Sequence, residues 1–234
     1  MANGGFITTN LVTGITGTSP EEAFPADNLK DGSSSRPCRW AAGSISITVS
    51  ASGNCSGIGI CGHNLRTGGS CTINGVSVPV VAGQSIWHKF STPTSLAALV
   101  INGGGVPKIG IGEIVMGSAT VFSHNFSYGW NEGRVYTNDI HETEFGMLLP
   151  YEKCNAGLYQ LPFQLLDSAA IATMKTLYQQ QRGSMIPFLL IFDIEAGPCC
   201  FGRLTNNYNT TYATLGVNTS MLEFREDPIG AFLS

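Results

Sequence analysis

The sequence predicts a mainly β protein, in which an N-terminal jelly-roll β-sandwich is followed by a β-sandwich or sheet domain with one packed α-helix. Short apolar segments recur along the chain between turn-forming residues, which are abundant at 29 Gly and 11 Pro among 234 positions. Such spacing is typical of short strands joined by turns. Only one segment shows a convincing helical period, and it lies in the second half of the chain.

Residues 1–117 are expected to form the first domain. Ser44–Ala51 alternates polar and apolar residues, the period of a half-buried strand. Cys71–Val81 indicates a hairpin with Asn74–Gly75 at its tip, because Asn-Gly favours the positive φ angles of a type I′ turn. Short strands without a helix indicate a sandwich or jelly roll. The other strand candidates are Gly57–Cys61, Ser85–Phe90, Ala97–Ile101 and Lys108–Met116.

Residues 118–234 are expected to form a second β domain with one helix at about 168–182. Asp167 or Ser168 can cap its first turn, an apolar stripe follows at helical spacing, and Gly183 is a typical stop. Met185–Phe192 is a continuous apolar run, which predicts a strand buried on both faces. The other strand candidates are Glu142–Leu149, Leu161–Leu166, Cys200–Leu204 and Ser220–Arg225.

Charged residues are scarce, at 12% of the chain, about half of the typical ~25%. The net charge is −4, which argues against nucleic-acid binding, and the apolar content argues against disorder. No apolar run approaches the ~20 residues of a membrane span, so no membrane insertion is expected. Residues 1–117 carry six basic and five acidic residues, whereas residues 118–234 carry six and eleven. A surface buried between subunits would explain the low charge.

Seven cysteines are present, and their odd number together with the lack of a secretory signal predicts reduced thiols in a cytosolic setting. No Cys-x-x-Cys pair occurs, so a structural zinc site is not expected. Most of the cysteines are expected to be small buried apolar residues. No metal or other cofactor is predicted.

Two stretches of the first half carry a family resemblance. Phe24–Gly32, followed by Trp40, resembles the start of discoidin-like, galactose-binding-like jelly rolls, and Ile58–Leu65 with Lys108–Gly117 resembles strands of such jelly rolls on bacteriophage structural proteins. Members of this family bind sugars or decorate particles. The resemblance therefore implies a jelly roll but does not decide its function.

A further resemblance lies in Leu161–Asp193, where a strand, a helix, an Arg-Gly turn and an apolar strand follow one another. This order resembles a module shared by bacteriophage tail-tip and tail-tube-like proteins, in which one helix packs on a β-sandwich that assembles into rings. The resemblance implies a distal or minor tail protein in which residues 118–234 form a tail-tube-like domain.

Five residues are candidates for a ligand site or an interface, and each also has a structural interpretation. Trp40 can be a sugar platform or a core plug. Trp87 and His88 are neighbours in a strand, so one of the two is expected to face solvent. Arg182 and Phe188 lie in the tail-like segment, where they can serve an interface or be a helix-end charge and a core residue.

Catalytic motifs are lacking, and no enzyme activity is predicted. The sequence has no Gly-x-Ser-x-Gly elbow, and its Gly103–Gly105 run is not followed by the Lys of a phosphate-binding loop. Acidic residues between Glu132 and Glu144 could act as glycosidase carboxylates or metal ligands, but an acidic surface is favoured. The residues concerned are Glu132, Asp139, Glu142 and Glu144, with His124 and His141.

Three functions remain open. The favoured one is a structural component of a tailed bacteriophage virion, which is assembled in the host cytoplasm, self-associates into a tail-tip ring and contacts other tail proteins. The alternative is a carbohydrate-binding module that recognises a cell-surface glycan through an exposed aromatic residue. The third is a hydrolase that uses the acidic residues between Glu132 and Glu144.

Overall fold

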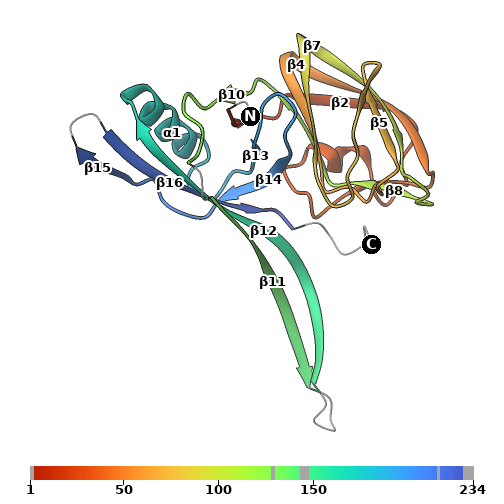
Figure 1. Ribbon diagram of the computed structural model, residues 1–234. Coiled ribbons are helices and arrows are strands. Elements are labelled where there is room, and N and C mark those ends of the chain that lie inside the picture. The colour runs from red at the N-terminus through yellow and green to blue at the C-terminus, as the bar shows by residue number, and fades with distance from the viewer. Residues whose placement is uncertain (1–2, 128–129, 143–147, 215–216, 229–234) are drawn as a thin grey trace.

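The computed structural model describes residues 3–127, 130–142, 148–214 and 217–228, and it confirms the mainly β class. Two large β-sheets stand side by side, and the one α-helix of the described residues packs on the second sheet (Figure 1). Within the described residues, no helix is of a length and apolar character that would let it cross a bilayer.

The first sheet is built around two long strands. β4 (Ser44–Cys61) contains two of the predicted short strands, and β7 (Ile86–Asn102) contains most of two others. The register between β4 and β7 shifts between Ser50 and Gly57, and such irregularities bend a strand. The strand order is β2–β4–β7–β5–β6, with β9 on β4; the bounds are β2 Val12–Gly17, β5 Ser70–Ile73, β6 Val76–Val78 and β9 Glu113–Gly117.

A short sheet of β3 (Cys38–Trp40) and β8 (Ile109–Ile111) shares one core with the long strands, which makes the first unit a sandwich. The predicted Asn74–Gly75 turn joins β5 to β6. Both residues have positive φ, at 50° and 82°, as a type I′ turn requires. The predicted jelly-roll class of this half is confirmed.

The second sheet has the order β10–β1–β13–β14–β16–β12–β11, with β15 on β16. Its strand β1 (Gly5–Ile7) comes from the N-terminus of the chain and pairs with β13 and β10. Residues assigned by sequence to the first domain therefore contribute to the second sheet, while the domain boundary at residue 117 stays a prediction. The other bounds are β10 Thr120–Val121, β11 Asn131–Glu142, β12 Leu148–Leu166, β13 Phe188–Ile191, β14 Cys199–Leu204, β15 Thr210–Thr214 and β16 Val217–Glu226.

The helix α1 spans Ser168–Gln180. Asp167 caps it, because its carboxylate accepts a hydrogen bond of 2.7 Å from the Ala170 N–H. The apolar stripe packs inward through Ala170, Met174, Leu177 and Tyr178. The helix ends two residues before the predicted position, since Arg182 adopts a positive φ of 48° and leaves the helical region.

The apolar run that follows the helix is only partly a strand. Phe188–Ile191 forms β13 and is fully buried, as predicted. Met185 is instead 69% exposed and Ile186 is 37% exposed. The prediction of a buried strand from Met185 onward was wrong, because Pro187 has no N–H for a sheet ladder and the chain still turns at this point.

A long hairpin projects from the second sheet. β11 and β12 pair from Asn131 with Gln160 outward to Glu142 with Leu148. β12 also pairs with β16, but only from Leu158 to Leu166. Beyond this point the hairpin has two strands, and Figure 1 shows it reaching far from the body of the molecule. β11 is not predicted by the sequence pattern.

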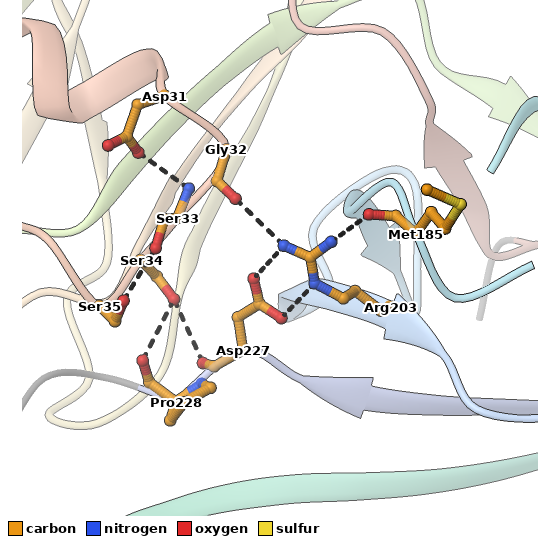
Figure 2. Close-up of polar contacts among 9 residues, drawn as sticks. All are labelled: Asp31, Gly32, Ser33, Ser34, Ser35, Met185, Arg203, Asp227 and Pro228. Atoms are coloured by element: carbon orange, nitrogen blue, oxygen red, sulfur yellow. Dashed lines mark hydrogen bonds and ion pairs between the residues drawn. The ribbon is translucent and has the colours of Figure 1, made fainter. Parts of the chain in front are cut away.

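The two sheets meet along an apolar seam. Ile7, Cys61, Val115 and Phe201 belong to its buried cluster. Polar contacts extend the seam at one end, where Ser34 donates to the backbone carbonyl of Asp227 over 3.2 Å. Figure 2 shows how the Arg203 guanidinium lies between the Asp227 carboxylate and the carbonyls of Gly32 and Met185. The first sheet is therefore tied to β14 and the end of β16.

Candidate ligand-binding cleft

A cleft of about 300 Å³ opens where the base of the hairpin faces the first sheet. This size is at the lower end of the range found for small-molecule sites. Three segments form its walls: the loop Gly83–Ser85 between β6 and β7, the loop that joins β13 to β14, and the first residues of β11 with Tyr159 of β12. Both halves of the chain thus contribute.

Aromatic rings form one wall of the cleft. Trp130 is 36% exposed, and its ring stacks on Phe192 with centroids 5.5 Å apart and an interplanar angle of 27°. Phe126 meets Trp130 edge-on at 5.8 Å, and Tyr159 lies at 5.0 Å from Phe192. Phe192 and Tyr159 are buried. The buried rings therefore pack against one side of the Trp130 ring and fix its position, while part of that ring remains exposed.

Ionisable groups surround these rings. Glu132 and Arg134 come from β11, Glu226 from the end of β16 and Asp193 from the loop after β13. Glu226 accepts a hydrogen bond of 3.2 Å from the Gly157 N–H. Burial raises the pKa of Glu226, while the Gly157 N–H and Arg134 oppose that shift. The cleft thus combines an apolar platform with hydrogen-bonding groups at its edge.

Cys199 and Cys200 both line the cleft, and burial raises the pKa of each thiol, so neither is an activated nucleophile. Cys200 donates to the Tyr159 hydroxyl over 3.3 Å, and burial raises the pKa values of both groups. A thiol must lose its proton to act as a nucleophile, so this environment opposes such chemistry. The six cysteines whose side chains are described are buried and free, as predicted, and Cys154 lies outside that set.

Two predicted ligand candidates are buried. Trp40 is 1% exposed in the first core, and its indole N–H donates to the Thr18 carbonyl over 2.9 Å. Trp87 is 5% exposed at the seam, where its N–H donates to the Ile194 carbonyl over 2.9 Å. Both indoles already have a hydrogen-bond partner, and neither presents its ring to solvent.

The other three candidates are scattered. His88 is half-buried beside Phe90, with ring centroids 5.6 Å apart, and burial lowers its pKa. Phe188 lies in the second core against Phe224. Arg182 is exposed after the helix. None of the five predicted candidates lines the cleft.

The acidic residues of the hydrolase hypothesis do not form a described site. Glu132 lines the cleft, and His124 lies elsewhere, next to the Ser123 hydroxyl. Asp139, His141 and Glu142 belong to β11, but their side chains, like the whole of Glu144, lie outside the described residues. Among the described residues, no group of three or more His, Cys, Asp or Glu side chains is arranged to hold a metal ion.

Trp130 is the residue that the sequence analysis missed. Its charged neighbours Glu132 and Arg134 do not distinguish it in the sequence, because Trp40 follows Arg39 and Trp87 lies two residues before Lys89. Its aromatic partners Tyr159 and Phe192 lie about 30 and 60 residues further along the chain, and only pairing in the second sheet brings them together.

Searches with protein-family models and among curated proteins found no match. Among solved structures, the chain is similar to a family 32 carbohydrate-binding module from C. perfringens NanJ in complex with galactose, at 19% identity over 48% of this chain and 98% of that chain, with a TM-score of 0.36. It is also similar to a truncated AlyQ with a family 32 module and alginate lyase domains, at 11% identity over 67% of this chain and 56% of that chain, with a TM-score of 0.33. Similarity at this level carries no inference about function.

Proposed function

We propose that the protein binds carbohydrate in the cleft beside Trp130. The observation that carries the proposal is the exposed indole ring, which stacks on Phe192 from behind. Sugar rings have an apolar C–H face that packs on a flat aromatic surface, and their hydroxyl groups need polar partners around it. Aromatic residues supply such a surface at a small cost in conformational entropy.

The edge of the cleft supplies those polar partners. Carboxylates accept hydrogen bonds from hydroxyl groups, and Arg134 can donate several. Glu132 is exposed beside the ring, whereas Glu226 is largely buried and already holds the Gly157 N–H. This arrangement of few oriented polar groups around an apolar surface is common in ligand sites.

Replacement of Trp130 by Ala is expected to weaken glycan binding at least about tenfold, which corresponds to about 1.4 kcal/mol. The ring provides most of the apolar contact, whereas Trp130→Phe keeps a smaller flat surface and should retain part of the affinity. A glycan array followed by titration calorimetry of the best ligand measures this. Trp40→Phe, which alters a buried ring, is the matched control. An array without hits, or full binding by Trp130→Ala, would overturn the proposal.

A second candidate function is a structural role in a bacteriophage tail tip, which the β11–β12 hairpin favours. A two-stranded hairpin is marginally stable alone in water, so a partner that covers it is expected. Residues 118–234 carry an excess of acidic residues and residues 1–117 a small excess of basic residues, which suits contact between unlike halves of neighbouring copies. Head-to-tail contacts of this kind form a ring when the rotation between successive copies closes.

Shortening the hairpin tests this second candidate. Replacing residues 138–153 by Asn-Gly leaves Thr137 opposite Cys154 and closes the strands with a tight turn. The full chain should form oligomers in mass photometry and join tails in an assembly assay, and the shortened chain should do neither while still binding glycan. A full chain that is monomeric at micromolar concentration and never joins tails would contradict it. The virion location and the absence of enzyme activity stay predictions.

A further inference from the structure

We propose that the cleft selects sugars that carry a free amino group, such as glucosamine units, over N-acetylated and acidic sugars. This inference rests on the proposed carbohydrate-binding function and names the ligand class of the same site. It depends on the charges around the Trp130 platform, where Glu132, Glu226 and Asp193 face a single guanidinium, that of Arg134.

The three carboxylates come from separate elements and surround the same space. Glu132 lies at the start of β11, and Asp193 follows β13, where it accepts a hydrogen bond of 3.0 Å from the Glu195 N–H. Glu226 ends β16. A protonated amine donates up to three hydrogen bonds and accepts none, so it fits a site that offers mainly acceptors. An N-acetyl group is uncharged and offers only one donor.

Glu226 increases the electrostatic attraction of this site for a cation. Its carboxyl group is largely removed from water, and Glu132 and Asp227 both add repulsion to its charged form. Of the residues that line the cleft around Glu226, Arg134 of β11 is the positive one. Arg203 of β14 and Arg225 of β16 are directed to Asp227, whose charged form they stabilise. Asp227 is itself paired with Arg203 at 3.2 Å. An arriving ammonium group would therefore offset part of the repulsion that Glu132 and Asp227 exert on the charged form of Glu226.

The same charges act against acidic sugars. A uronate or sialate carboxylate would enter a space with more negative than positive groups, and like charges at close range cost several kcal/mol. The preference is therefore an ordered one: free amine first, neutral sugars next and acidic sugars last. The Trp130 ring does not contribute to this preference, because a flat aromatic ring packs equally well on the C–H face of an amino sugar, a neutral sugar or an acidic sugar.

Oligosaccharides that differ only at the amino group give the sharpest test. Titration calorimetry at pH 6 and physiological salt compares glucosamine oligomers, N-acetylglucosamine oligomers of the same length, and oligouronates. Hydrogen bonds to charged groups are stronger than those between neutral groups, so the free amine should bind about tenfold or more tightly than its acetylated counterpart. Glu132→Gln should lower that ratio several-fold, because it removes a charge that favours the ammonium group but keeps a hydrogen-bond acceptor for either oligomer.

Control variants separate the possible outcomes. Glu22→Gln removes one exposed carboxylate from the first sheet's surroundings and should leave the ratio unchanged; a similar loss in this variant would show general charge attraction and overturn the inference. Equal binding of the two amino-sugar forms, or tight binding of oligouronates, would also overturn it while the proposed function stands. Absence of binding to all three ligands and to a wider array would instead remove the proposed function itself.

Discussion

Replacement of Trp87 by Ala is expected to lower the free energy of unfolding by about 3–5 kcal/mol, the range for removing a large buried aromatic side chain. Trp87 fills the seam between the sheets, where its indole N–H is bonded to Ile194. Gly57 leaves room for the Trp87 ring because it has no side chain; a Cβ at that position would clash with the ring. Urea unfolding followed by circular dichroism measures the change.

Two further variants make the Trp87 result specific. Trp87→Phe keeps much of the apolar contact and loses the hydrogen bond to Ile194, so its cost should be about 1–3 kcal/mol because the carbonyl is left without that donor. Trp130→Ala changes an exposed ring and should cost less than either. If Trp87→Ala folded with full stability but lost glycan binding, the indole would be a ligand contact and the seam role assigned to it would be wrong.

Glu113 is expected to make the protein less stable as pH rises from about 4.5 to about 8. This carboxyl group is 1% exposed, and burial, followed by repulsion from Asp31, raises its pKa to about 8. Asn10 and the Gly32 N–H donate to it over 3.1 and 3.2 Å and oppose the shift. In this interval the folded protein holds a proton that the unfolded chain has released.

Unfolding therefore releases a proton, and raising the pH favours the unfolded state. At about 1.36 kcal/mol for each unit of pKa, the effect reaches on the order of 5 kcal/mol and levels off above pH 8. Glu113→Gln should remove this slope, so that the variant is more stable than the parent at pH 8.5. At pH 5 it should be no more stable, because its amide N–H₂ must face one of two donors, the Asn10 side-chain amide or the Gly32 N–H.

Chemical denaturation at several pH values checks this prediction. Glu22→Gln, at an exposed position, should leave the pH profile as it is in the parent protein. A slope between pH 4.5 and 8 that survives unchanged in Glu113→Gln would show that other groups produce it.

Local patterns were enough to predict the fold class and several elements. The Asn74–Gly75 turn, the cap at Asp167 and the buried strand Phe188–Ile191 all depend on interactions within a few residues. The helix end was predicted too late, because the backbone leaves the helix at Arg182 rather than at Gly183. The pattern could not show that β4 joins two predicted strands through an irregular segment.

The cleft could not be predicted in the same way, because its groups meet only through long-range pairing. Trp130 precedes β11 and Phe192 follows β13, and three strands, β14, β16 and β12, lie between β13 and β11 in the sheet. β1 has three residues, which is too short for a periodic signal. The ligand candidates Trp40 and Trp87 were chosen for residue type, and residue type does not distinguish a buried indole from an exposed one.

The composite walls of the cleft link ligand binding to the contact between the two sheets. Gly83–Ser85 belongs to the first unit, while Trp130 and Glu226 belong to the second. A ligand that touches both walls binds only when the sheets are docked, so it stabilises the docked state by mass action. Conversely, a substitution that loosens the seam raises the apparent dissociation constant in inverse proportion to the fraction of molecules that keep the docked arrangement. The affinity of this cleft is thus a measure of how firmly the two halves of the chain are held together.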